Sequence, residues 1–104
     1  MIEVKRTPNT LSITGHAHYA EPGKDIVCAA VSTLVQTLLW SLEGLTEDVV
    51  NNVCLRGNVY FKFGNLSERA QLLMDSFFVG IQLVAENYPD YVTVREGGTE
   101  NEQI

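Results

Sequence analysis

Two short segments near the start of the chain alternate apolar and polar residues. They are IEVK (2–5) and LSIT (11–14), and the turn-forming pair Pro8-Asn9 lies between them. A period of two is typical of strands that bury one face, so this pattern predicts a β-hairpin. Residues 17–24, AHYAEPGK, have no usable periodicity and contain a Pro-Gly pair, which predicts a loop.

A wide apolar stripe follows Asp25 and changes the period from two to between three and four. Its members are Val27, Ala30, Val31, Leu34, Val35, Leu38 and Leu42. This spacing predicts a helix whose buried face is central to the core. Asp25 is a good N-cap, because its carboxylate can accept hydrogen bonds from the free amides of the first turn. Gly44 is the expected C-terminal stop.

The second half of the chain repeats the order of strand, strand and helix. Residues 53–56 and 58–63 flank Gly57 and are expected to form a second hairpin. Ser67 is expected to cap a second helix, which Pro89 ends. The residues expected near the buried side of that helix are Leu73, Phe77, Ile81, Val84 and Tyr88.

Residues 91–95 form the predicted last strand, so the order of elements is ββαββαβ. This order predicts an α+β two-layer sandwich, in which two helices pack on one face of a mixed sheet. Residues 1–95 are expected to form a single domain, and the polar residues 96–104 a frayed, disordered tail.

Composition and charge argue against several classes of function. The 104 residues are 45% hydrophobic, and 7 Lys and Arg stand against 13 Asp and Glu, for a net charge of −6. A net-acidic chain without a basic cluster is poorly suited to grip phosphate backbones, so no direct binding of nucleic acid is expected. The apolar window from Ile26 to Leu42 is shorter than a bilayer span and contains polar residues, so no membrane association is expected either.

The segment MIEVKRTPNT has no apolar stretch behind its charges, so no export signal is expected. The chain is therefore expected in the cytoplasm, where Cys28 and Cys54 remain free thiols rather than a disulfide. Cys54 has apolar neighbours in its strand and is expected in the core. No cofactor is expected.

Four residues around the start of the first helix can carry chemistry, and they are His16, Asp25, Cys28 and Ser32. The free amides and the dipole of a helix N-terminus favour a thiolate at Cys28. A nearby imidazole can take the thiol proton and later protonate a leaving amine, while helix amides help to hold an oxyanion. Ser32, one turn further on, can orient the site or simply bond its own i−4 carbonyl. The ordinary alternatives are a small core cysteine, a capping Asp and a boundary histidine.

The motifs around these residues resemble the ribosomal-processing cysteine protease family Prp. The resemblance is carried by GHAHYA, by GKDIVCAAVS, by the ββαββαβ order and by the start of the second helix, GNLSERAQLL. It implies a cytosolic bacterial endopeptidase that removes the N-terminal extension of a large-subunit ribosomal protein, with a cut after an aromatic pair. By position, the resemblance makes Cys28 the nucleophile and His16 its general base, with Asp25 and Ser32 in support.

The resemblance also implies homodimers and a mobile loop that closes over substrate. The loop residues expected to meet the substrate are Gly15, Ala17, His18, Tyr19 and Gly23. His18 stands where the family often has a small residue, and with His16 and Cys28 it also resembles a set of metal ligands. The flexible loop and the cap role of Asp25 favour no metal. Gly15 and Gly23 bracket the loop, either as hinges or as ordinary turn residues.

Other interpretations stay open at this point. A non-catalytic ribosome-assembly or peptide-binding protein on the same fold would use the acidic surface to dock a basic partner. Several aromatic side chains either line a pocket for an aromatic pair or, more simply, pack the core or a dimer: Tyr60, Phe61, Phe63, Phe77 and Phe78. Trp40 is expected at an interface rather than in the site.

Overall fold

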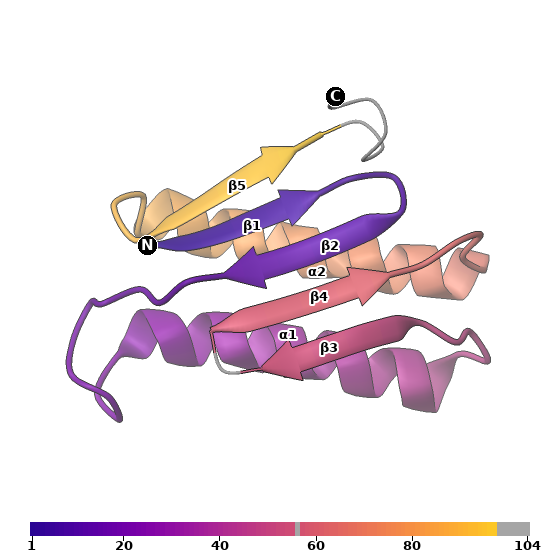
Figure 1. The fold of residues 1–104 in the computed structure, drawn as a ribbon, viewed down its shortest axis with the longest axis horizontal. Helices are drawn as coiled ribbons and strands as arrows, with labels where there is room; N and C mark the ends of the chain where they lie inside the picture. The colour runs from indigo at the N-terminus through magenta and orange to yellow at the C-terminus, as the bar shows by residue number, and fades with distance from the viewer. Residues whose placement is uncertain (56, 98–104) are drawn as a thin grey trace.

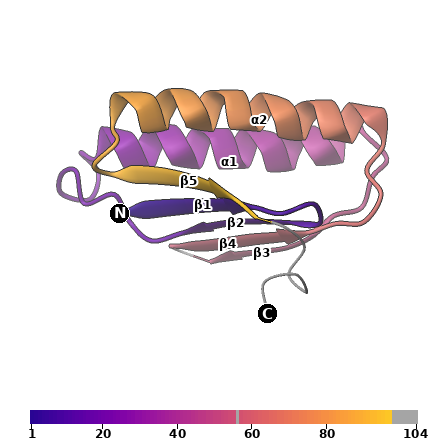
Figure 2. The same ribbon diagram turned by 90° about the horizontal axis from the view of Figure 1, so that it is seen from above.

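Two helices cover one face of a five-stranded sheet, as Figures 1 and 2 show. The computed structural model describes residues 1–55 and 57–97. The elements are β1 Ile2–Arg6, β2 Thr10–Thr14, α1 Ile26–Leu45, β3 Asn51–Leu55, β4 Asn58–Lys62, α2 Glu68–Asn87 and β5 Val92–Glu96. The predicted α+β class and the ββαββαβ order are therefore confirmed.

The sheet is mixed, with the strand order β3-β4-β2-β1-β5. β1 and β5 are parallel, and the other neighbouring strands are antiparallel. The chain leaves β2, passes through α1 and returns to β3, and β4 is inserted between these two strands. As a result, β3 is an edge strand, and α1 begins at the end of the sheet where β2 finishes (Figure 1).

The core lies between the sheet and the two helices, and it contains the predicted apolar faces. Val4, Leu11 and Phe61 from the sheet are fully buried, as are Met74 and Ile81 from α2. The buried stripe of α1 consists of Val27, Val31, Val35, Leu38 and Leu42. α2 buries Ala70, Met74, Phe77, Phe78 and Ile81, and the expected Leu73, Val84 and Tyr88 are only partly buried against this core.

The ends of the helices follow local hydrogen bonding. Asp25 caps α1 and Ser67 caps α2 through their side chains, as predicted. α1 continues to Leu45 and its cap is Thr46, so the prediction that Gly44 stops the helix was wrong. The reason is that the Thr46 hydroxyl donates to the Leu42 carbonyl at 2.7 Å and satisfies the end of the helix without glycine.

Two further expectations change in the structure. α1 has 20 residues and is long and apolar enough to cross a membrane by length and composition, so the argument from a short window was wrong. Length and composition alone are weak evidence for a membrane span, because the core helix of a soluble protein passes the same test. The apolar stripe of α1 packs in the core. Glu96, expected to begin the tail, is the last residue of β5, and residues 98–104 lie outside the described residues.

Candidate active site

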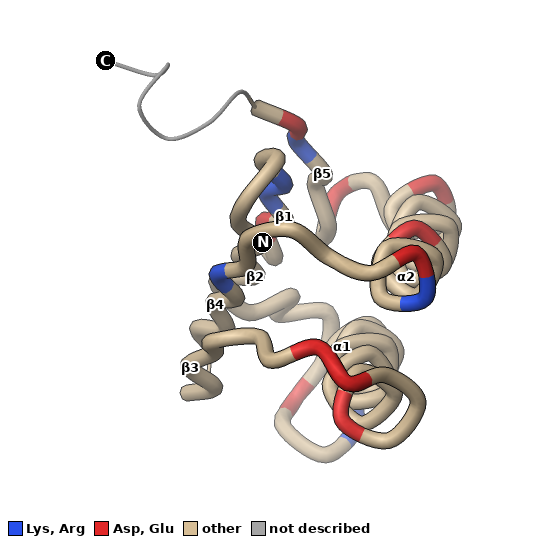
Figure 3. The backbone as a smooth tube through the Cα atoms, turned by 90° about the vertical axis from the view of Figure 1, so that its right-hand side faces the viewer, with Lys and Arg blue, Asp and Glu red and all other residues tan. Residues whose placement is uncertain are grey.

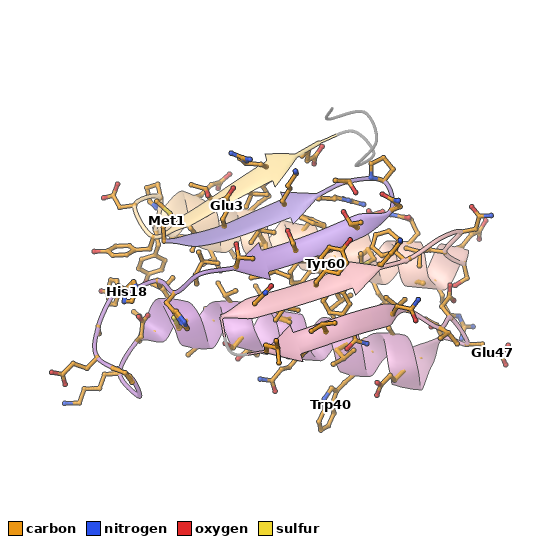
Figure 4. The ribbon with its side chains drawn as sticks, viewed as in Figure 1. Met1, Glu3, His18, Trp40, Glu47 and Tyr60 are labelled. Carbon is orange, nitrogen blue, oxygen red and sulfur yellow. The ribbon has the colours of Figure 1, made fainter. Side chains whose placement is uncertain are left out.

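The candidate catalytic residues gather at one end of the sandwich because of the connection between β2 and α1. This connection, residues 15–25, passes over the N-terminal end of α1 (Figure 1). Figure 4 shows His18 of this connection beside the start of α1. The topology thus brings His16, Asp25 and Cys28 together, although they are separated in the sequence.

Cys28 lies in the first turn of α1, and its side chain is half-buried. The main-chain N–H of Ala17 donates a hydrogen bond to the Cys28 sulfur at 3.4 Å. Ala17 is 3% exposed, and it belongs to the hydrophobic core. The thiol is therefore held between the helix start and a loop residue whose N–H group points at it.

The Asp25 carboxylate joins the helix to the loop. Its Oδ1 accepts the main-chain N–H groups of Val27 at 3.1 Å and Cys28 at 3.0 Å. Its Oδ2 accepts the N–H groups of Tyr19 at 2.9 Å and Ala20 at 3.3 Å. Partial desolvation raises the pKa of the Asp25 carboxyl, but the hydrogen bonds from Cys28, Ala20 and Tyr19 outweigh it, so this pKa lies below its usual value.

These hydrogen bonds also determine which amides near Cys28 are free to bind an oxyanion. The amides of Val27 and Cys28 are occupied by the Asp25 side chain, and the amide of Ala29 donates to the Asp25 carbonyl at 3.1 Å. The expectation that amides of the helix start would hold an oxyanion was therefore wrong for these three groups. Asp25 already accepts the N–H groups of Val27, Cys28 and Ala29 through its side chain and its carbonyl.

His16 follows β2 and lies against the turn between β3 and β4. A Cβ atom at Gly57 would lie 2.6 Å from the His16 Nε2 atom, so the imidazole rests directly on the glycine backbone. Gly15 has φ +92°, and a Cβ there would lie 2.2 Å from the Met1 carbonyl oxygen. The Met1 backbone leaves no room for a side chain at Gly15, and a side chain at Gly57, where φ is +76°, would displace the His16 ring.

One groove of about 1000 Å³ contains both His16 and Cys28. It continues along α1 to Trp40 and is bounded on its other side by residues of the β3–β4 hairpin, Cys54, Leu55, Gly57, Asn58 and Val59. Among the described residues, no hydrogen bond joins the imidazole to the thiol. The groove is nevertheless the place where an extended peptide can meet both groups.

Ser32 and Cys54 are both exposed and both line the groove, which agrees with the predicted site role of Ser32 and not with the predicted core position of Cys54. Ser32 is exposed and lines the groove one turn after Cys28, and within the described part of the chain its hydroxyl has no hydrogen-bond partner. Cys54 is exposed and also lines the groove, so the prediction that it packs in the core was wrong. Cys54 pairs with Val59 on the face toward the helices, but the helix layer does not cover the edge strand β3 there.

The loop residues His18 and Gly23 both have positive φ angles, 54° and 85°, so the chain turns sharply at each. The His18 and His16 rings lie 5.8 Å apart between centroids, and both residues line the groove. Across residues 1–55 and 57–97, no group of three or more His, Cys, Asp and Glu side chains is placed to hold a metal ion.

Tyr19, predicted as a loop residue that meets the substrate, is not among the described residues that line the groove, and it makes contacts that the sequence does not reveal. Its ring packs edge-on against the rings of Tyr88, at 5.7 Å between centroids, and Tyr91, at 5.1 Å. Those two residues lie between α2 and β5, far along the chain. The loop thus packs against residues from the C-terminal part of the chain.

Of the five aromatic residues considered for a substrate pocket, Tyr60 is half-buried on the outer face of the sheet, and the other four pack in the core. Phe61, Phe63, Phe77 and Phe78 are buried, and none of them lines the groove. Trp40, expected at an interface rather than in the site, is 74% exposed, and it lines the groove at its far end from Cys28 (Figure 4). Its helical spacing from Cys28 and Ser32, at multiples of four, is the signal that places all three on one side of α1.

A cysteine at a helix start and a histidine in the same groove are the two groups that a thiol-dependent hydrolase needs, so the site fits this class of enzyme. The comparisons with known proteins specify this class further. Residues 1–93 match the profile of the family described as cysteine protease Prp. The chain therefore belongs to the Prp family of ribosomal processing cysteine proteases and is a cysteine protease.

The relatives agree in sequence and in fold. The ribosomal processing cysteine protease Prp of Mycoplasma genitalium is 29% identical over 97 residues, which cover 92% of this chain and 96% of the relative. The Prp of Bacillus subtilis is 29% identical over 92 residues, with 82% of each chain covered. Both relatives are bacterial proteins of similar length.

Two solved structures show the same fold. The essential ribosomal processing protease Prp from S. aureus, in complex with a covalently linked product peptide, superposes with a TM-score of 0.90 at 24% identity, covering 93% of this chain and 100% of that one. SMU.848 from Streptococcus mutans superposes with a TM-score of 0.76 at 33% identity, covering 94% and 93%.

Proposed function

We propose that this chain is a cytoplasmic endopeptidase that removes the N-terminal extension of a large-subunit ribosomal protein. The observation that carries the proposal is the half-buried Cys28 thiol, which shares one groove with His16 and receives the Ala17 N–H. Support for the substrate comes from the relatives, which are named ribosomal processing proteases. A related S. aureus structure contains a covalently linked product peptide.

In the proposed reaction, His16 takes the proton of the Cys28 thiol and the sulfur attacks the scissile carbonyl carbon. A carbon–sulfur bond forms, and the carbonyl electron pair moves onto oxygen. When this tetrahedral intermediate collapses, the carbon–nitrogen bond breaks and His16 returns the proton to the leaving amine. Water then hydrolyses the thioester, which restores the Cys28 thiol and releases the cleaved extension with a new C-terminal carboxyl group.

Asp25 and Ser32 have supporting roles in this proposal. The carboxylate accepts four main-chain N–H groups, two from α1 and two from the loop, so its role is to position Cys28 relative to the loop. It takes no part in proton transfer. The exposed Ser32 hydroxyl faces the groove and can bind the peptide backbone.

The character of the groove supports an extended, uncharged peptide segment. Among the described residues that line the groove, the ionisable ones are two histidines, two cysteines and Asp25. The Asp25 carboxylate is already engaged as the helix cap. Acidic residues occur on the helices and their connections, whereas the few basic ones lie mainly on the strands (Figure 3). A net charge of −6 favours encounter with a basic ribosomal protein.

A homodimer is part of the proposal. The outer face of α2 exposes an apolar stripe, with Leu72 at 68%, Val79 at 72% and Leu83 at 61% exposure. Their spacing of seven and four places these residues on one side of the helix, and a second copy would cover them. Sedimentation of the protein and of Val79→Glu tests this: the proposal predicts a dimer that the substitution dissociates.

The test of the function compares the two cysteines of one groove. A peptide spanning the ribosomal extension is incubated with the protein, with Cys28→Ala and with the matched control Cys54→Ala, and the products are identified by mass spectrometry. The proposal predicts a single cut, after an aromatic pair, that Cys28→Ala abolishes and Cys54→Ala retains. Equal cutting by Cys28→Ala contradicts the assignment of the nucleophile, and binding without any cut supports a non-catalytic peptide-binding protein.

A further inference from the structure

The first part of the loop after His16, residues 17–20, contacts the rest of the protein at three separate places. The side chain of Ala17 packs in the core. The Asp25 carboxylate holds the amides of Tyr19 and Ala20. The Tyr19 ring packs on two aromatic rings from the α2–β5 connection. Three contacts with different parts of the fold set the position of a short segment that is adjacent to the nucleophile.

The peptide group between His16 and Ala17 is oriented from both of its sides. Its carbonyl oxygen accepts a hydrogen bond from the main-chain nitrogen of Met1 at 2.6 Å. Its N–H donates to the Cys28 sulfur at 3.4 Å. Because the carbonyl and the N–H of a trans peptide point in opposite directions, the Met1 contact directs the N–H toward the thiol.

An oxyanion formed at Cys28 needs a donor, and the amides of Val27 and Cys28 are already engaged. The N–H of Cys28 itself is held by Asp25 at 3.0 Å, and that of Val27 by the same carboxylate oxygen. The Ala17 N–H is directed at the sulfur, so it lies within reach of an oxygen on the carbon that bonds to that sulfur. A donor fixed before the reaction is the arrangement that stabilises developing charge.

The Tyr19 contacts explain how this donor stays in place. Tyr88 donates its main-chain N–H to the Val84 carbonyl at 2.9 Å, and Tyr91 donates to the Tyr88 carbonyl at 3.0 Å, so both residues belong to a hydrogen-bonded corner between α2 and β5. Tyr19 packs edge-on against each of them. Only His18 separates Tyr19 from Ala17, and its φ of 54° makes a sharp turn between them.

We propose that the Ala17 main-chain N–H donates to the oxyanion of the tetrahedral intermediate, and that Tyr19, packed on Tyr88 and Tyr91, is the positioning residue that holds it there. This inference rests on the proposed function, because it requires Cys28 to attack a carbonyl. In the step concerned, the sulfur–carbon bond forms and the carbonyl π electrons move to oxygen. That oxygen accepts the Ala17 N–H until the carbon–nitrogen bond breaks and the carbonyl re-forms.

The first test uses Tyr19→Ala, with Tyr19→Phe as the conservative variant and Tyr60→Ala as a control on the outer face of the sheet (Figure 4). We expect Tyr19→Ala to lower kcat for peptide cleavage at least about tenfold, toward the ~100-fold loss seen when an oxyanion donor is removed, with KM changed less than about threefold. Tyr19→Phe and Tyr60→Ala are expected to keep kcat.

A second measurement separates the stabilisation of the oxyanion from the reactivity of the Cys28 thiol. Alkylation of Cys28 by iodoacetamide forms no oxyanion, so its plateau rate at high pH is expected to stay within about twofold in Tyr19→Ala. An unchanged kcat in Tyr19→Ala overturns the inference, and so does a parallel loss of cleavage and alkylation. A cut that survives Cys28→Ala overturns the proposed function itself, and with it this inference.

The donor can also be removed without changing any side chain. Chemical synthesis of the chain with an ester in place of the His16–Ala17 amide deletes the N–H and leaves the Ala17 methyl group in the core. We expect kcat to fall on the order of 100-fold, with a melting temperature close to that of the all-amide protein. Full kcat in the folded ester protein overturns the inference.

Discussion

The Asp25 carboxylate accepts the main-chain N–H of Cys28 at 3.0 Å, so the amide of the nucleophile is part of the helix cap. The other oxygen of the same carboxylate holds two amides of the preceding loop. One side chain therefore fixes the start of α1 and the loop relative to each other. The predictions below test this arrangement and the groove around it.

Substitution of Asp25 separates its two roles. Asp25→Ser keeps a helix cap but cannot also reach the loop amides of Tyr19 and Ala20, whereas Asp25→Ala loses both functions. We expect both variants to lose at least about tenfold in kcat/KM, because a small displacement of a positioning group costs up to about 100-fold. Only Asp25→Ala is expected to lower the melting temperature clearly. Wild-type cleavage by Asp25→Ser would show that the loop contacts are dispensable.

Gly57→Ala is expected to displace the proposed general base. The new Cβ would lie 2.6 Å from the His16 Nε2 atom, and the φ of +76° disfavours any side chain there. We predict a loss of at least about tenfold in kcat, since the imidazole must move from its present position. The measurement is peptide cleavage under saturating substrate.

Gly44→Ala is the matched control for that substitution. Gly44 lies in the last turn of α1, and nothing lies within 4 Å of a Cβ placed there. Alanine has the higher helix propensity, so the free energy of unfolding is expected to rise by up to about 1 kcal/mol with kcat unchanged. If Gly57→Ala and Gly44→Ala had the same kcat, His16 would not depend on its contact with the β3–β4 turn.

The wall of the groove is expected to contribute to binding of the peptide. Trp40 is 12 residues after Cys28 on the same helix, which corresponds to about 18 Å along the axis, or five to six residues of an extended peptide. We predict that Trp40→Ala raises KM several-fold for a long peptide and leaves kcat unchanged. A peptide too short to reach Trp40 is expected to show no difference, and a loss of kcat instead of KM would contradict this assignment.

Acid is expected to weaken the connection between the two halves of the chain at Asp48. Its carboxylate accepts the Ser67 hydroxyl and the Ser67 N–H, the latter at 2.8 Å. The Ser67 side-chain and main-chain hydrogen bonds lower the pKa of Asp48, and desolvation opposes them only in part. The folded-state pKa therefore lies below the unfolded value near 3.8.

The sign of the pH effect follows from that direction. Stability from this contact is fully present above the unfolded-state pKa and is lost as the pH falls through the lower folded-state pKa. Asp48→Asn should therefore be less stable than the wild type in urea at pH 7, and the gap should shrink as the pH falls below about 3.8. A gap that stays constant across this range would contradict the assignment.

Much of the fold was predictable from the sequence because its signals are local. The period of two in β1 and β2, the stripe of α1 and the caps Asp25 and Ser67 each depend on neighbouring residues only. The candidate site was predictable in outline for the same reason: the end of β2 and the start of α1 are joined by a short connection, so His16 and Cys28 must lie near each other.

The rest depends on contacts between distant parts of the chain. Cys54 lies on the face of β3 that is turned toward the helices, as its apolar neighbours predict. The strand order leaves β3 at the edge of the sheet, where no helix covers Cys54. The contact of Tyr19 with Tyr88 and Tyr91 joins the loop to the α2–β5 connection, and no sequence period records it. The cap at Asp25 was predictable, but the hydrogen bonds from Tyr19 and Ala20 to the second oxygen of its carboxylate were not, because they depend on the path of the loop.

The central claim is that Cys28 carries the acyl group of the substrate. The most direct measurement is acid quenching of the protein with its peptide after a few milliseconds, followed by mass spectrometry of the intact chain and of its proteolytic fragments. We predict an adduct equal to the acyl part of the N-terminal product, located on the fragment that contains Cys28 and absent in Cys28→Ala. An adduct on Cys54, or cleavage that continues in Cys28→Ala without any adduct, would contradict the account.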